Sequence, residues 1–183
     1  MGNISNFVKR IRDIMRNDAG INGDAQRIEQ IAWMLFLKVY DAKEQDWEWD
    51  EEDYQSIIPE KCRWRNWGHD EDRKGMTGDI LLDFVNNILF PTLKNLSVNA
   101  DTPIKKAIVQ TTFADANNYM KDGVLLRQVI GVIDELDLTD YEESHAFGES
   151  PFSHISNKIC NSNDLCYTLC YVVALDHYNC TKN

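Results

Sequence analysis

The chain has 183 residues, of which 43% are hydrophobic and 27% charged, an ordinary composition for a soluble globular protein. With 30 acidic and 19 basic residues its net charge is −11, which makes it a poor stand-alone DNA binder, because affinity for DNA comes largely from basic side chains. No apolar run approaches the ~20 residues of a membrane span, and the first residues lack the apolar stretch of a signal peptide. We therefore expect a cytoplasmic protein with no membrane partner.

The first 40 residues read as two helices. Phe7, Ile11 and Met15 recur at helical spacing, and residues 17–20 (NDAG) provide a turn that ends this first stripe. Asp24 is a candidate cap for a second helix, which is apolar on nearly every face from residue 28 to residue 40. Such a helix is expected at the centre of the core, with Trp33 buried.

Residues 41–60 are strongly acidic, with nine acids against one base, Lys43. We interpret this stretch as a solvated acidic loop that carries Trp47 and Trp49. A nucleic-acid mimic or a metal site is the alternative, and the spacing supports neither of them.

Residues 61–68 interleave bases with aromatic rings: Lys61, Arg63 and Arg65 alternate with Trp64 and Trp67. This pattern suits a loop packed through cation–π contacts. It equally suits a surface that stacks on bases or contacts phosphates. Both interpretations stay open on the sequence alone.

Three further helices are predicted, over residues 77–95, from Pro103 to about Val109, and from about Asp122 to Leu136. The stripe of the first of these runs through Ile80, Leu81, Phe84, Val85, Ile88 and Leu89, and Pro91 is expected to kink or end it. No alternating strand pattern is long enough to indicate a sheet. The predicted fold class is all-α, an irregular bundle of about five to seven helices with long polar loops.

Recognisable catalytic motifs are absent from the printed sequence. It contains no phosphate-binding glycine loop, no H-E-x-x-H zinc motif and no G-x-S-x-G nucleophile elbow. The four histidines are scattered, and no acidic pair lies in an apolar setting that would assign acid and base roles. We predict no catalytic, cofactor-binding or metal-ligating residue in this chain.

The last 35 residues, 149–183, differ in composition from the rest. They hold four of the five cysteines and only five charged residues. Cys166 and Cys170 form one closely spaced pair, which a zinc site could use together with Cys160, His154, His177 or Cys180. The alternatives are a tail helix that packs its thiols as small apolar groups, or disorder.

Five segments in order resemble the N-terminal helical domain of the modification (DNA methyltransferase) subunit of type I restriction-modification systems. They follow an amphipathic first helix and read IEQIAWMLFLK (28–38), RWRNW (63–67), LLDFVNN (81–87), LLRQVI (125–130) and IDELDL (133–138). The resemblance covers residues 1–148, a helical N-terminal domain. Beyond residue 148 the sequence departs from the family pattern, and we expect a divergent tail produced by truncation or frameshift.

The resemblance implies a cytoplasmic bacterial protein whose complete subunit transfers a methyl group from S-adenosylmethionine to adenine N6. It implies as partners a specificity subunit, other modification subunits and, within the complex, DNA. The family's catalytic domain carries an S-adenosylmethionine loop and an Asn-Pro-Pro-aromatic motif, and neither occurs here. We therefore expect no S-adenosylmethionine in this chain and no methylation by it alone, but a role in subunit assembly and in closure around DNA.

Local charge points to two segments as DNA or partner contacts. Residues 1–16 carry a local charge of +3, with Lys9 and Arg12 as candidates, and residues 61–74 carry +2, with Lys61, Arg63 and Arg65 as candidates. Ordinary solvated surface is the alternative for both segments. The alternative for the chain as a whole is a free-standing interaction or regulatory fragment that binds restriction-modification subunits.

Overall fold

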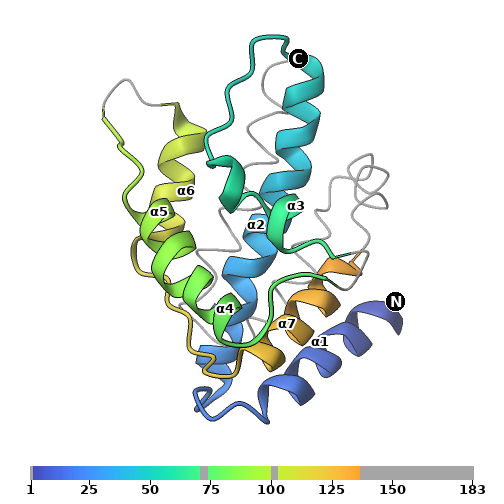
Figure 1. The fold of residues 1–183 in the computed structure, drawn as a ribbon. Helices are drawn as coiled ribbons and strands as arrows, with labels where there is room; N and C mark the ends of the chain where they lie inside the picture. Colours follow the sequence, from blue (N-terminus) through green and yellow to red (C-terminus); the bar gives the residue numbers. More distant parts are fainter. Residues whose placement is uncertain (1, 71–73, 100–102, 137–183) are drawn as a thin grey trace.

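Helix α2 is the central element of the fold, and the other helices pack around it (Figure 1). The computed structural model describes residues 2–70, 74–99 and 103–136, and these residues form helices and connecting loops with no β-strand among them. The predicted all-α class is thus confirmed. The elements are α1 (Gly2–Met15), α2 (Asp24–Asp50), η1 (Glu60–Cys62), α3 (Trp64–Trp67), α4 (Gly78–Asp83), η2 (Phe84–Leu89), α5 (Phe90–Lys94), α6 (Ile104–Ala114) and α7 (Gly123–Asp134).

The middle of α2 is buried on all sides, as its composition predicts. Every residue from 31 to 37 is buried; Trp33 is 1% exposed and Leu35 is fully covered. The Trp33 ring stacks near Trp67 of α3 and meets Phe90 of α5 edge-on, with centroids 6.4 and 5.1 Å apart. Helix α2 therefore joins the two sides of the domain in one hydrophobic core.

The expectation of an acidic loop over residues 41–60 is wrong for its first half, because α2 continues to Asp50. Asp41, Glu44 and Trp47 follow one another at three-residue spacing on the inner face of the helix, and all three are buried. Trp49 points the other way and is 90% exposed. The acidic residues 51–53 do lie in an exposed loop.

Helices α1 and α7 lie side by side, although they are far apart in the sequence (Figure 1). Phe7, Ile11 and Met15 of α1 are buried, as their spacing predicts. An ion pair of 2.5 Å between Arg10 and Glu135 ties the two helices together at the surface. The first and last described helices are thus packed against each other.

Helices α4, η2 and α5 form one continuous helix with a wide π turn at residues 84–89. Pro91 does not end this helix, which goes on to Lys94 and so agrees with the predicted span to residue 95. In the π turn the Phe90 amide donates to the carbonyl of Val85, five residues back, so the helix is already wide where the proline ring enters it. Ile80, expected on the core stripe, is instead 70% exposed.

Helix α6 extends to Ala114 rather than to Val109, because Thr112 and Phe113 are also buried. Helix α7 begins as predicted: the Asp122 carboxylate caps it by accepting from the amides of Val124 and Leu125 at 2.8 and 3.0 Å.

Two buried polar side chains hold the loop between α6 and α7 against the rest of the domain. The Asp18 carboxylate accepts from the amides of Lys121 and Asp122 at distances from 2.9 to 3.1 Å. Gln30 of α2 accepts from the amide of Tyr119 at 3.0 Å and donates to the side chain of Asn118 at 2.9 Å. These bonds fix the start of α7 relative to α2.

Some sequence expectations fall outside the described residues. They are the cysteine-rich tail at 149–183, its zinc alternative and the domain boundary at residue 148. Within the described ranges, no helix has the length and hydropathy needed to cross a membrane.

Candidate partner and DNA-binding surface

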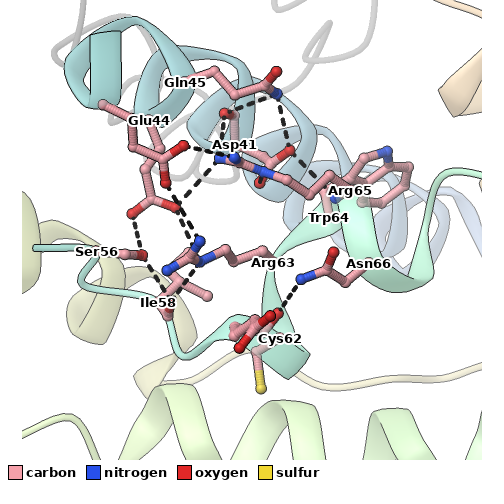
Figure 2. Close-up of polar contacts among 12 residues, drawn as sticks. Asp41, Glu44, Gln45, Ser56, Ile58, Cys62, Arg63, Trp64, Arg65 and Asn66 are labelled. Carbon is pink, nitrogen blue, oxygen red and sulfur yellow. Dashed lines mark hydrogen bonds and ion pairs between the residues drawn. The ribbon is translucent and has the colours of Figure 1, made fainter. Parts of the chain in front are cut away.

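Arg63 and Arg65, the foremost predicted contacts, lie beside the second half of α2 (Figure 2). The Arg65 guanidinium donates to Asp41 Oδ1 at 2.9 Å and to Glu48 Oε2 at 2.7 Å. The Arg63 guanidinium donates to Glu48 Oε1 at 3.3 Å and to the carbonyl of Ile58 at 3.3 Å. Both arginines therefore bind carboxylates of the same chain.

The acidic side of this network comes from a single helix face. Asp41, Glu44 and Glu48 occupy positions i, i+3 and i+7 of α2, which places them in one row. Glu44 Oε2 lies 3.8 Å from both Arg63 Nε and Arg65 Nη2. We call these five side chains the acid–arginine network; its three carboxylates and two guanidiniums give it a formal charge of −1.

Tryptophan packing sets the position of the arginines. Trp64 and Trp67 of α3 are 3% and 2% exposed and pack edge-on with ring centroids 5.2 Å apart. The Trp67 indole donates to the carbonyl of Cys62 at 3.1 Å, which holds the turn that enters α3. Since the indoles point into the core, Arg63 and Arg65 are left at the surface of α3 that faces α2.

Burial makes the network electrostatically uneven. Glu44 has no exposed surface, and its Oε1 accepts from the hydroxyls of Ser56 at 2.7 Å and Tyr54 at 3.3 Å, while its Oε2 has no hydrogen-bond partner. Burial raises the pKa of Glu44, and the hydrogen bond from Ser56 and the charge of Arg63 offset this only in part. Burial likewise raises the pKa of Asp41 against the pull of Arg65.

A second polar cluster lies on the other side of α3, around Asp134 at the end of α7. Its Oδ1 accepts from the Trp64 indole at 2.8 Å, its Oδ2 lies 2.7 Å from His69 Nδ1, and Lys38 Nζ lies 3.7 Å from Oδ1. Burial alone would raise the pKa of Asp134, but these two hydrogen bonds and the charge of Lys38 hold that pKa below its ordinary value. A cavity of about 290 Å³ separates this cluster from the acid–arginine network, and its lining includes Lys38, Asp41, Arg65, His69 and Asp134.

The other predicted contacts lie elsewhere. Lys61 is exposed in η1, and on α1 Lys9 is exposed while Arg12, three residues on, is half-buried. Arg16 continues their row and pairs with Asp13 at 3.2 Å. The structure thus brings Arg63 and Arg65 together, while Lys9 and Arg12 form a separate basic stripe on α1; DNA contact by any of the five residues stays a prediction.

Sequence reasoning missed the carboxylate partners of the two arginines. Asp41, Glu44 and Glu48 were assigned to a solvated loop, although their i, i+3, i+7 spacing is the signal of a helix face. Of the two interpretations of residues 61–68, packing describes the observed contacts, but these are ion pairs rather than the expected cation–π contacts. The described cation–π contacts involve other residues: Lys105 Nζ lies 3.5 Å from the centre of the Trp47 ring and 5.7 Å from that of Tyr54.

No group of three or more histidine, cysteine, aspartate or glutamate side chains in the described part of the chain is arranged to hold a metal ion. Cys62, the last residue of η1, is buried, and burial raises the pKa of its thiol. What the described surface offers chemically is charge and hydrogen bonding.

Comparison with known proteins agrees with the resemblance in the sequence. A family model described as the HsdM N-terminal domain matches residues 4–133. The methylase subunit of the type I restriction enzyme EcoEI from Escherichia coli is 49% identical over 146 residues, which are 80% of this chain and 29% of that subunit. The chain therefore spans less than a third of the length of this curated relative.

Solved structures give the same result. A protein from Vibrio vulnificus YJ016, assigned as the modification subunit of a type I restriction enzyme, matches with a TM-score of 0.75 and 30% identity over 86% of this chain and 35% of its own. A chain from a structural study of complex assembly and conformational transition in a type I restriction-modification system matches with a TM-score of 0.66 and 28% identity, over 88% of this chain and 31% of its own. On the family match and the agreement of fold, the chain belongs to the HsdM N-terminal domain family, the N-terminal domain of type I modification subunits.

Proposed function

We propose that this chain serves as the non-catalytic helical domain through which a type I modification subunit assembles with its partners and closes around DNA. The observation that carries the proposal is the match of this domain to less than a third of a methylase subunit. A domain that corresponds to less than a third of the subunit carries out only part of the subunit's function, and other parts of the subunit carry out the rest.

The structure supports a scaffolding role. Helix α2 ties the domain into one core, and the acid–arginine network and the Asp134 cluster fix α3 between α2 and α7. A rigid body of this kind can transmit force or orientation between subunits, since packed cores deform little. Catalysis would need other functional groups than those of these two polar clusters.

We propose that S-adenosylmethionine binding and adenine-N6 methylation belong to another part of the complete subunit. The printed sequence has neither the glycine-rich loop nor the Asn-Pro-Pro motif that the resemblance leads one to expect for that chemistry. Calorimetric titration of the isolated chain with S-adenosylmethionine should give no measurable heat of binding. A micromolar dissociation constant would overturn this part of the proposal.

The proposed partners are the specificity and modification subunits of a type I complex, with DNA bound only within that complex. The relative studied for complex assembly belongs to such a system. Because the chain has a net charge of −11, its contact with DNA depends on local basic segments and on basic partners.

Deletion in a complete modification subunit tests the proposal. The residues equivalent to 4–133 are removed, and the shortened and complete subunits are each mixed with the specificity subunit and analysed by size-exclusion chromatography with light scattering. The shortened subunit should still bind S-adenosylmethionine, which shows that its catalytic part is folded, but should lose stable assembly or DNA methylation. If it assembles and methylates as the complete subunit does, the proposal is wrong.

A further inference from the structure

Trp49 is the outlier among the five tryptophans. Trp33, Trp47, Trp64 and Trp67 are between 1% and 6% exposed, whereas Trp49 is 90% exposed. An indole buries more apolar surface than almost any other side chain when a partner covers it, and tryptophan is enriched among the residues that dominate protein–protein binding energy. Trp49 contributes nothing to the core of this domain, so its apolar surface is available to a partner.

Acidic side chains surround Trp49. Asp46 and Asp50 lie on the last turns of α2, and Glu51, Glu52 and Asp53 follow in the loop; all five are exposed. Two nearby lysines are already engaged: Lys43 pairs with Asp46 at 3.6 Å, and Lys105 lies over the Trp47 ring. We call residues 46–53 the Trp49 tip.

The Trp49 tip is held in a defined orientation. Trp47, two residues away, is 6% exposed and packs edge-on against Tyr40 with ring centroids 5.7 Å apart. The amide of Glu51 donates to the carbonyl of Trp47 at 3.0 Å and completes the last turn of α2. Because the backbone is fixed in this way, a partner that covers Trp49 would have to order little beyond the indole itself.

The charge of the tip decides which class of partner fits it. Exposed carboxylates repel DNA phosphates, so a nucleic acid is disfavoured here. They attract lysine and arginine side chains, and a basic rim around an apolar pocket would complement both the acids and the indole. We propose that the Trp49 tip is a docking site for a basic protein surface that receives the indole of Trp49 in an apolar pocket.

This inference rests on the proposed function, which places the chain in a complex with DNA-binding proteins. Such proteins carry basic surfaces, because their affinity for DNA requires them. The partner surface is thus defined by its chemistry: positively charged, belonging to a protein of the complex and apolar at its centre.

Site-specific photo-cross-linking in the assembled complex tests the inference. A complete modification subunit of this sequence carries p-benzoylphenylalanine in place of Trp49 and is irradiated after assembly with the specificity subunit and duplex DNA. Mass spectrometry should find the cross-link on a protein segment with a net positive charge. The matched control places the same group at Ile80, another exposed apolar position. Ile80 belongs to α4, and α4 lies at the other end of the domain from the last turns of α2 (Figure 1), so this control should give a different product.

Two variants measure the contribution of the tip. Trp49→Ala should weaken association of the subunits about tenfold or more, as expected for a buried interface tryptophan. The double variant Glu51→Lys, Glu52→Lys should weaken it further at low salt and less at high salt, because its effect is electrostatic. Neither change touches the core, so circular dichroism of both variants should match the parent chain.

The outcomes separate the inference from the proposed function. Any of four results overturns the inference: a cross-link to DNA, a cross-link to an acidic segment, no cross-link, or unchanged association of both variants. If the subunits still assemble normally in these experiments, the proposed function stands. If the deletion of residues 4–133 has no effect on assembly or methylation, the proposed function fails first, and the inference fails with it.

Discussion

The Trp64 indole donates a 2.8 Å hydrogen bond to the Asp134 carboxylate, which lies seventy residues further along the chain. This bond links α3 to the end of α7, and both of its partners are largely covered. The Trp64 ring thus packs into the core, while its indole N–H is bound by the Asp134 carboxylate. The neighbouring Arg65 is placed by the same short helix, so the bond bears on the geometry of the whole acid–arginine network.

Asp134→Asn should lower the free energy of unfolding at pH 7 by about 1–3 kcal/mol, the usual cost of weakening hydrogen bonds to a buried charged group. The folded-state pKa of Asp134 lies below the ordinary aspartate value of about 3.9. Its contribution is therefore complete above that value and is lost as the pH falls through the lower folded-state pKa. Urea unfolding at several pH values should show the gap between parent and variant closing below about pH 4. The exposed Asp13→Asn serves as control and should change stability little at any pH.

Glu44→Gln should leave the protein as stable as the parent at pH 7, or more stable. Burial raises the pKa of Glu44, so the folded state binds a proton more readily than the unfolded state. The parent therefore gains stability as the pH falls from 7 through the raised pKa towards about 4.3, and the variant lacks this gain. Glu48→Gln is the matched comparison: Glu48 hydrogen-bonds to both arginines and is partly exposed, so its loss should cost about 0.5–1 kcal/mol. A large loss at Glu44 and none at Glu48 would contradict this account.

Leu35→Ala should cost about 2–5 kcal/mol, the range for truncating a fully buried leucine. The urea midpoint at pH 7 measures the change. Ile80→Ala removes an apolar side chain of similar size that is 70% exposed, and it should change stability by less than about 0.5 kcal/mol. Equal effects at the two positions would mean that the core is placed wrongly.

Gly123→Ala and Gly131→Ala should act in opposite directions, although both glycines lie in α7. A Cβ at position 123 would lie 1.9 Å from the carbonyl oxygen of Gly78, so α4 and α7 would have to separate. A Cβ at position 131 meets nothing within 4 Å, and alanine in a helix interior is favoured over glycine by about 1 kcal/mol. Thermal unfolding should show a lower midpoint for the first variant and a higher one for the second.

The predicted DNA contacts are tested in a complete modification enzyme as two pairs, Lys9→Ala with Arg12→Ala and Arg63→Ala with Arg65→Ala. Affinity for duplex DNA is measured over a range of salt concentrations. We expect the slope of log affinity against log salt to become shallower by about 0.9 for each phosphate contact removed. An unchanged slope would mean that the pair makes no phosphate contact. Arg63→Lys with Arg65→Lys preserves the charge and separates loss of a contact from loss of the ion pairs within the domain.

Periodicity was sufficient to predict the helices whose faces differ in polarity. The buried positions of α1 and the central burial of α2 follow from apolar spacing, and so does the start of α7 near Asp122. Periodicity did not predict the second half of α2, because Asp41, Glu44 and Glu48 look like solvated residues until their partners are known. Those partners, Arg63 and Arg65, lie beyond a loop, and no local pattern connects the two groups.

Two other differences have local physical causes. The helix through Pro91 continues because a π turn precedes it, and such a turn has no sequence signature as clear as the proline itself. Ile80 fits the spacing of its apolar neighbours, but it lies in the first turn of α4 and is 70% exposed. The spacing of apolar residues identifies one face of a helix. A residue on that face is buried only where a neighbouring element also covers its turn of the helix.

The packing of α1 against α7 constrains the order in which the domain can fold during synthesis. Phe7, Ile11 and Met15 leave the ribosome first, but the helix that covers them ends at Asp134. At bacterial and eukaryotic elongation rates of about 5–20 residues per second, these side chains wait roughly 6–25 s for their partner. During that time the segment that forms α1 has no α7 to cover its apolar residues, and a segment of 14 residues is only marginally helical by itself. The native contact between Arg10 and Glu135 can therefore form only after nearly the whole described chain has been made.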